Sequence, residues 1–260
     1  METALTDETN PILFAVDGSI ARLTLNRPEK RNALNAQVVR HLKDGLRSSE
    51  KDNSVRVIVI AGAGQDFCSG ADLSSLKKIS EASASENLDD AHSLMELFAV
   101  IREIQVPVVA AVHGRALAGG CGLACACDLV LASRSARFGY PEVKIGFVPA
   151  MVMAILRRNI SEKRAFELIT RGAEISAGEA KEIGLVNQVF DDDDFPNEVD
   201  SYVRVFERLS RSALALTKSL LYQMDGMALD EALETGADVN VIARMADDCQ
   251  KGLARFLDKE

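Results

Sequence analysis

Two short segments of small residues give this chain its clearest potential for chemistry. Residues 68–73 follow the apolar run 55–61, and residues 114–122 follow the apolar run 106–112. Glycine and alanine let backbone approach a ligand closely, and the first N–H groups of a helix have no acceptor inside that helix. Two such turns could present N–H groups to one oxygen atom. For either turn taken alone, close packing of helices is the commoner explanation.

Three of the five cysteines lie close together, at Cys121, Cys125 and Cys127. A zinc site needs further Cys or His ligands at a suitable spacing, and this cluster has neither a second pair nor a nearby histidine. An odd number of cysteines in a chain of this size also favours reduced thiols over a disulfide framework. We therefore predict no metal, and expect small thiols packed along a helix.

The histidines and two of the aspartates are expected to be structural. His41, His92 and His113 have no carboxylate or nucleophile at a spacing that would make a catalytic pair. Asp72 and Asp128 follow apolar or small-residue segments, where a short carboxylate accepts backbone N–H bonds. We predict that these aspartates cap turns or helices and do not act as bases.

Strands and helices must alternate to hold the two turns in place. Residues 12–26 alternate around Asp17 and Gly18, a pair typical of a β-hairpin. Residues 35–49 carry apolar side chains on one helical face. Continuous apolar runs typical of buried strands occupy residues 55–61, 106–112 and 129–133. This order predicts an α/β fold.

The remaining pattern is mainly helical. Residues 74–90 are polar with few apolar anchors, so we expect a mobile surface loop or frayed helix there, able to serve as a lid. The acidic run 191–194 is expected to be solvated surface, and Pro196 to interrupt the helical pattern. Helices are predicted at residues 91–104, 116–127, 164–171, 176–183, 200–223 and 229–256.

Charge and composition argue against several classes of protein. The chain has 260 residues, and its 39 acidic residues against 30 basic ones give a formal net charge of -9, which disfavours a nucleic-acid partner. The apolar runs are too short to span a bilayer, so no membrane partner is expected. Residues 1–10 contain acidic but no basic side chains, a composition that disfavours a secretory or mitochondrial leader. We therefore expect a cytoplasmic location.

Six segments, taken in order, point to one family. They are residues 26–34 (NRPEKRNAL), 68–73 (CSGADL), 113–122 (HGRALAGGCG), 127–129 (CDL), 138–146 (FGYPEVKIG) and 180–186 (AKEIGLV). Any one of them is a weak signal, whereas the ordered set over nearly the whole chain is highly specific. With these segments the chain resembles the enoyl-CoA hydratase/isomerase, or crotonase, superfamily.

The resemblance implies the architecture of that superfamily. We expect an α/β crotonase-like spiral of ββα repeats over residues 1–195, and a helical C-terminal trimerisation region over residues 196–260. The expected assembly is a homotrimer or a homohexamer built from two trimers. No cofactor is expected, because coenzyme A is part of the acyl-CoA substrate.

The resemblance also implies the catalytic groups. Two peptide N–H groups, at Ala71 and Gly119, would form an oxyanion hole, and Glu142 would transfer protons. By default a lone glutamate beside Lys144 would be a surface or salt-bridged residue. Family hydratases commonly use two glutamates, and Gly122 stands at the first position here. Hydration would then need Glu142 to hold water and deliver the proton itself, or polar groups of the substrate to occupy the space left at Gly122.

The same resemblance assigns contacts to coenzyme A. Basic side chains beside the first motif suit its phosphates, small or apolar residues line the approach, and the C-terminal pair Phe256 and Lys259 reaches the ligand of a neighbouring subunit. The alternative for each charged residue is an ordinary surface charge. The residues concerned are Lys30, Arg31, Ala33, Leu34, Ala71, Asp72, Leu73, Phe256 and Lys259.

The implied activity is hydration of a short or branched enoyl-CoA, a lyase reaction. Residues 139–158 are similar to a bacterial branch of enoyl-CoA or methylglutaconyl-CoA hydratases. A single carboxylate also suits an isomerase that shifts the double bond. A non-catalytic acyl-CoA-binding homologue is the third alternative, because Gly122 lacks the first carboxylate.

Overall fold

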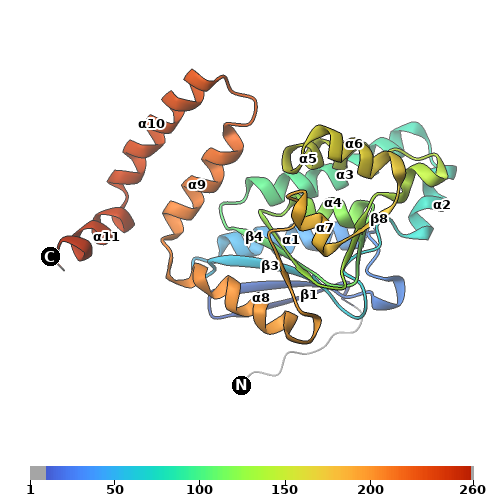
Figure 1. Ribbon diagram of the computed structural model, residues 1–260, viewed down its shortest axis with the longest axis horizontal. Helices are drawn as coiled ribbons and strands as arrows, with labels where there is room; N and C mark the ends of the chain where they lie inside the picture. The colour runs from blue at the N-terminus through green and yellow to red at the C-terminus, as the bar shows by residue number, and fades with distance from the viewer. Residues whose placement is uncertain (1–9, 259–260) are drawn as a thin grey trace.

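A computed structural model gives the fold of residues 10–258; of residues 73–76 within that range it describes the backbone alone. Figure 1 shows a layered body from which the last helices project. The strands are β1 (Ile12–Asp17), β2 (Ile20–Leu25), β3 (Val57–Gly62), β4 (Val108–Val112), β5 (Arg115–Leu117), β6 (Leu129–Ser133), β7 (Arg137–Gly139), β8 (Glu174–Ser176) and β9 (Gln188–Phe190).

The α-helices cover the sheets and form the C-terminal part. They are α1 (Ala36–Lys51), α2 (Leu73–Glu81), α3 (Ala84–Glu103), α4 (Gly119–Ala126), α5 (Ala150–Asn159), α6 (Glu162–Arg171), α7 (Ala177–Glu182), α8 (Phe195–Val203), α9 (Arg211–Gln223), α10 (Leu229–Met245) and α11 (Asp247–Leu257). In the part of the chain that the structure describes, no helix has both the length and the apolar character of a membrane span.

Two sheets form the framework. The larger has the order β1-β2-β3-β4-β6-β9, and the smaller has the order β5-β7-β8. Strand β1 pairs antiparallel with β2 through the predicted hairpin, with Asp17 opposite Ile20 and Gly18 at φ 59. The pairs from β2 to β9 are all parallel, so their carboxyl ends meet at one edge. The α/β expectation is confirmed.

Both faces of the larger sheet are buried, as its continuous apolar strands require. In β3, Ile58 and Ile60 face the core that contains α1, α3 and α4. Val57 and Val59 alternate with them and pack on the opposite side against Val199 and other residues of α8. Figure 1 shows α8 on the far side of the sheet from the other helices. The two cores fix the strand edge at which the small-residue turns begin.

Residues 74–90 were expected to form a mobile surface loop or a frayed helix; the loop is wrong, and the structure has helix here. This segment forms α2 and the first turns of α3, so the predicted helix 91–104 begins at Ala84. Ser83 and Glu86 make a capping box, in which each side chain bonds the other's backbone N–H. The polar composition reflects solvent exposure of the first turns, since the buried apolar residues of α3 start at Leu97.

Several predicted helix boundaries also differ from the structure. The predicted helix 200–223 is interrupted, because α8 ends at Val203 and Ser210 caps the start of α9. The predicted helix 229–256 breaks at Ala246, which has extended backbone. Pro196 does not interrupt a helix but lies in the first turn of α8, where its missing N–H costs no helical bond. Helix α5 and the short strands β5, β7, β8 and β9 were not predicted.

The C-terminal helices α9–α11 project from the body (Figure 1), and many of their large apolar side chains are exposed. A single copy of the chain would leave these side chains in water, which fits their predicted use in assembly. The most exposed are Leu221, Leu229, Leu233, Met245, Phe256 and Leu257. The trimer or hexamer and the boundary at residue 195 stay predictions.

A buried cation joins α9 to the body. Lys218 is only 7% exposed, and its Nζ donates to the carbonyl oxygens of Ile101 at 2.8 Å and Val106 at 3.1 Å. It also pairs with Asp128 Oδ2 at 2.7 Å, and Asp128 accepts a further bond from the Tyr222 hydroxyl. Burial lowers the pKa of Lys218, and the Asp128 carboxylate opposes that effect. The charge is therefore held by a complete set of acceptors.

Replacing this lysine tests the anchor. The Lys218→Met variant keeps the length of the side chain but leaves the Asp128 carboxylate without its cation, so we expect a loss of about 3 kcal/mol in the free energy of unfolding. Urea denaturation followed by circular dichroism measures it. The matched control is Ser219→Ala at the exposed neighbouring position, with a change within about 0.5 kcal/mol. Equal stability of both variants would show that Lys218 does not stabilise the attachment of α9 to the body.

Candidate active site

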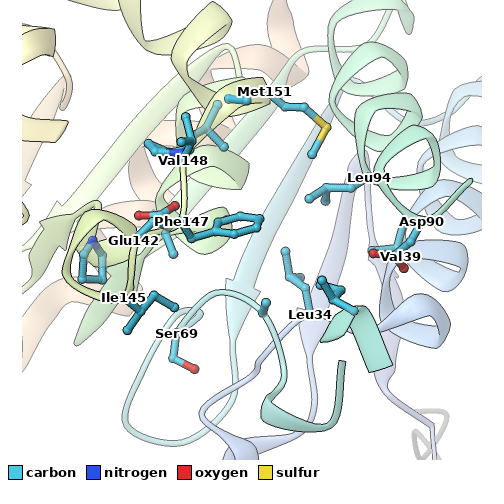
Figure 2. Close-up of a pocket in the computed structure, with 18 of the residues that line it drawn as sticks. Leu34, Val39, Ser69, Asp90, Leu94, Glu142, Ile145, Phe147, Val148 and Met151 are labelled. Carbon is cyan, nitrogen blue, oxygen red and sulfur yellow. The ribbon is translucent and has the colours of Figure 1, made fainter. Parts of the chain in front are cut away.

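An elongated, mainly apolar cavity of about 450 Å³ lies where the two small-residue turns meet α3 and the segment 141–152. Figure 2 shows Leu34, Val39, Asp90 and Leu94 on one side of it, with Glu142, Phe147 and Val148 on the other. The apolar lining comes mainly from Leu34, Val39, Ile79, Leu94, Ile145, Phe147, Val148, Met151 and Val152. A cavity of this kind suits an uncharged chain with a few polar groups at one place.

The first turn directs the N–H group of Ala71. Leu34 bonds the residues on both sides of Ala71: its N–H donates to the Gly70 carbonyl oxygen at 2.7 Å, and its own carbonyl oxygen accepts from the N–H of Asp72 at 3.0 Å. In a parallel pairing of this kind, the N–H and C=O groups of the middle residue, here Ala71, point away from the paired strand. The N–H of Ala71 therefore points away from Leu34, and Ala71 lines the cavity.

The second turn carries Gly119 at the first position of α4. An N–H at this position has no acceptor within the helix. The preceding residue, Ala118, has φ 52 and ψ -126, a conformation that costs a non-glycine residue about 1–3 kcal/mol. Its N–H donates to the Gly139 carbonyl oxygen at 2.8 Å, which helps to hold this conformation. Ala118 and Gly119 both line the cavity.

The two turns are packed directly against each other. The N–H of Leu117 donates to the carbonyl oxygen of Cys68 at 2.9 Å. Gly70 has φ 97, and a Cβ built there would lie 2.8 Å from Ala118 Cβ and 3.5 Å from the nitrogen of Gly119. Glycine is therefore required at position 70 both for its conformation and for space. The expectation that the two turns come together is met in the described structure.

Glu142 lies on the 3-10 helix η2 (Pro141–Ile145) and is half-buried. Its Oε2 is buried, with no hydrogen-bond partner among the residues that the structure describes. Burial raises the pKa of Glu142, and a bond to its own backbone N–H opposes this effect. No ion pair with Lys144 is present within the described chain, so the salt-bridged alternative is not supported. A carboxyl group with a raised pKa is suited to giving and accepting a proton in catalysis.

The space beside Gly122 is not open to a ligand. A Cβ built on Gly122 would lie 2.1 Å from Val152 Cγ1 and 3.4 Å from Phe98 Cζ. The expectation that polar groups of a substrate occupy this space is therefore wrong, because Val152 of α5 fills it. Val152 itself lines the cavity. An apolar side chain thus stands where a second carboxylate was considered, so the Gly122 side offers no carboxylate to partner Glu142.

Comparisons with known proteins agree with this geometry. The family model described as Enoyl-CoA hydratase/isomerase matches residues 15–260. The chain belongs to this family.

Relatives and solved structures of the family match over almost their full lengths. A Thermus thermophilus protein, named provisionally as an enoyl-CoA hydratase, is 40% identical over 93% of this chain and 96% of its own. The 2,3-dehydroadipyl-CoA hydratase of Escherichia coli is 34% identical over 91% of each. The crystal structure of an enoyl-CoA hydratase of Mycobacterium smegmatis has a TM-score of 0.92 and 31% identity, over 96% of this chain and 97% of that one. The predicted crotonase fold is confirmed.

The structure brings some of the predicted coenzyme A residues of this family member to the cavity. Leu34 and Ala71 line it, whereas Ala33 is buried behind it. Lys30 and Arg31 are exposed where η1 (Pro28–Lys30) ends, and the carbonyl oxygen of Arg31 accepts from the N–H of Ser69 in the first turn. Their side chains are thus placed near the first turn and remain available to water.

The other predicted contacts are placed differently. Asp72 pairs with Arg27 Nη2 at 2.7 Å, which steadies the first turn and fits a turn residue better than a base. The side chain of Leu73 and the whole of Lys259 lie outside the described residues. Phe256 is 67% exposed on α11, so a role of Phe256 at a ligand depends on a neighbouring subunit and stays a prediction.

The sequence interpretation missed the opposite wall of the cavity. Phe147, Val148, Met151 and Val152 follow the glutamate motif in a mainly apolar stretch. The first two lie on the loop before the unpredicted helix α5, and the last two lie on its first turn. These apolar residues were a signal in the sequence that could have predicted an apolar wall for an acyl chain. The strained conformation of Ala118 had no signal, since alanine gives no sign of a positive φ.

A double-mutant cycle tests the packing of Gly122 on Val152. Gly122→Ala inserts a methyl group into filled space, with an expected loss of about 1–3 kcal/mol of stability. Adding Val152→Ala to Gly122→Ala should recover part of it, so that the two effects are non-additive. Gly178→Ala is the control, because a Cβ there meets only Ser176 Oγ at 3.9 Å. Strict additivity in chemical denaturation would show that the two residues do not touch.

The raised pKa of Glu142 makes a prediction about stability and pH. The folded state holds this proton more tightly than the unfolded chain, so the group's contribution to stability is present at low pH and is lost as pH rises through the raised pKa. We expect the wild type to lose stability relative to Glu142→Gln over this interval. Urea denaturation of both from pH 4 to 8 measures the difference, and a difference independent of pH would refute a raised pKa.

Proposed function

We propose that this protein is an enoyl-CoA hydratase that adds water to a short or branched enoyl-CoA. Glu142 is its single acid/base group, and the N–H groups of Ala71 and Gly119 bind the thioester oxygen. The observation that carries the proposal is the half-buried Glu142 carboxyl, which lies in the same cavity as both turns and has one oxygen without a partner among the described residues. The family and the names of its relatives support the reaction class.

The chemistry requires the two N–H groups. Addition of a nucleophile to the β-carbon of an enoyl thioester moves negative charge to the thioester oxygen. Fixed donors aimed at that oxygen stabilise the developing enolate by about 3 kcal/mol each. Two donors are available at once because the turns carrying Ala71 and Gly119 are packed together through Gly70.

One carboxyl group is sufficient for the proton transfers. The Glu142 carboxylate accepts a proton from water while the water oxygen bonds to the β-carbon, and the enolate forms. The protonated Glu142 then gives its proton to the α-carbon, which restores the carboxylate and the thioester carbonyl. The proton and the hydroxyl group arrive from the same side of the substrate, because both come from the Glu142 wall. The apolar Val152 leaves no carboxylate on the Gly122 side.

The lining supports an uncharged acyl chain. Phe147, Val148 and Leu94 offer apolar surface to it. Two carboxyl groups, those of Asp90 and Glu142, face each other across the cavity (Figure 2) and together disfavour a chain that ends in a carboxylate, while Lys144 adds a single positive charge to the lining. The substrates proposed here therefore differ in charge from the diacid thioester in the name of the Escherichia coli relative.

An isomerase is the second candidate. A single carboxyl group next to an apolar wall can also remove a proton from one carbon and return it to another, and the Val152 packing favours this as much as hydration. Binding of acyl-CoA without catalysis is the third candidate function.

We also propose that the chain assembles as a homotrimer or homohexamer through α9–α11 and that its location is cytoplasmic. The exposed apolar side chains of these helices support the assembly.

Turnover of a panel of enoyl-CoA thioesters tests the proposal. The panel pairs each uncharged acyl chain with one of the same length that ends in a carboxylate, and mass spectrometry detects gain of a water molecule. In water labelled with oxygen-18, hydration places the label in the product, whereas isomerisation leaves the mass unchanged. We expect labelled hydroxyacyl-CoA from the uncharged chains.

The Glu142→Gln variant should lower kcat by about 100-fold or more, because the amide cannot exchange the proton. The matched control is Glu182→Gln at an exposed position on α7, which should keep wild-type turnover. Full turnover by Glu142→Gln, or binding of acyl-CoA by the wild type without any turnover, would contradict the proposed function.

A further inference from the structure

We propose that Tyr140 is a positioning residue, which holds the Glu142 carboxyl in place relative to the N–H group of Gly119 through a buried contact of its hydroxyl group with Cys125. This inference rests on the proposed function of Glu142 and Gly119. It also assigns a role to the cysteine cluster, which forms no metal site in the part of the chain that the structure describes.

Tyr140 is among the largest side chains that are fully buried. Its hydroxyl oxygen lies 3.4 Å from Cys125 Sγ, and the side chain of Cys121 is also fully buried. Both thiols are on α4, four residues apart and therefore on one face of the helix. Tyr140 thus connects the segment that precedes Glu142 to the face of α4 that carries Cys125, and α4 begins with Gly119.

A second contact joins the same two segments at their other end. The N–H of Ala118 donates to the carbonyl oxygen of Gly139 at 2.8 Å. The residue before Gly119 is therefore bonded to the residue before Tyr140. The backbone bond and the side-chain contact together restrict the rotation of η2 relative to α4 more than either would alone. They therefore fix the orientation of η2 against α4.

The link to Glu142 is short and stiff. Pro141 separates Tyr140 from Glu142 and begins η2, and its ring fixes φ. A change in the direction of Tyr140 therefore moves the Glu142 carboxyl as well. Proton transfer is sensitive to such shifts, because a displacement of about 1 Å can cost about 100-fold in rate.

The hydroxyl group is not needed to fill space. Phenylalanine has nearly the same shape, and a buried hydroxyl is favourable only where it has a partner. Burial raises the pKa of Tyr140 well above its ordinary value, so the group stays neutral and acts through hydrogen bonds, not through charge. A buried hydroxyl group that contacts the Cys125 thiol points to a role in fixing the orientation of Tyr140 and, with it, of Glu142.

The Tyr140→Phe variant is the direct test. We expect kcat to fall about tenfold, with KM for the enoyl-CoA within twofold of wild type and an unchanged urea midpoint. The acid limb of the pH profile of kcat should move, since the surroundings of the Glu142 carboxyl change. Phe138→Leu is the matched control: Phe138 is equally buried on β7 but has no polar contact, so its loss should lower the urea midpoint without moving the acid limb.

The cysteines give a second route, should Tyr140→Phe fail to fold. Cys125→Ala should repeat the loss in kcat, and Cys125→Ser, which keeps a hydrogen-bonding group, should restore most of it. Combining Tyr140→Phe with Cys125→Ala should cause no further loss, since both remove the same contact. Wild-type kcat and pH profile in Tyr140→Phe or in Cys125→Ala would overturn the proposal.

A readout that does not depend on turnover separates this inference from the proposed function. The pKa of Glu142 can be followed by NMR of carbon-13-labelled glutamate, with Glu142→Gln used to assign the signal. A pKa altered by Tyr140→Phe in a protein that hydrates no enoyl-CoA would refute the function but sustain the positioning role. Hydration by the wild type with the same Glu142 pKa in both proteins would refute the positioning role alone.

Discussion

The contact between the two small-residue turns is the constraint on which the site depends. Gly70 lies against Ala118 and the nitrogen of Gly119 so closely that no side chain fits between them. The parallel sheet brings these turns to one edge, and hydrogen bonds between Cys68 and the segment 115–117 hold them together. The strained backbone at Ala118 is held in the same place. Two backbone N–H groups are thereby kept near each other.

Around this fixed pair, the wall of the cavity determines the chemistry. Glu142 supplies one carboxyl group with a raised pKa, and Val152 excludes a second from the Gly122 side. The remaining lining is mainly apolar, which limits the water that can compete for the donors. The proposed function needs a site of this kind, because an enolate must be stabilised and one proton moved at a time. Hydration and double-bond migration share these needs, which explains why a single family carries both names.

Local signals in the sequence predicted much of the framework. The Asp17 and Gly18 pair predicted the first hairpin, and the apolar face of residues 35–49 predicted α1, because both depend on neighbours in the chain. The polar composition of residues 74–90 was misleading, although the capping pair Ser83 and Glu86 was visible. A polar composition indicates that residues are exposed to solvent, and in this segment the exposed residues are helical.

The parts of the site that could not be predicted depend on distant packing. The ordered motifs indicated which residues meet at the cavity, but not that Val152 fills the space beside Gly122, thirty positions earlier in the chain. The same holds for the contact of Tyr140 with Cys125, which depends on how β7 lies under α4. The C-terminal helices present a different case, since their exposed apolar side chains fit an assembly that one copy of the chain does not contain.

The infrared stretching frequency of the thioester carbonyl in a bound acyl-CoA tests the central claim most directly. A carbonyl that accepts two fixed N–H bonds is polarised, so a carbon-13-labelled thioester should absorb at a lower frequency in the complex than in water. Gly119→Pro, which removes one donor, should return the frequency toward the value in water. A frequency in the wild-type complex equal to that in water would contradict the account, because the Ala71 and Gly119 N–H groups would then not hold the oxygen.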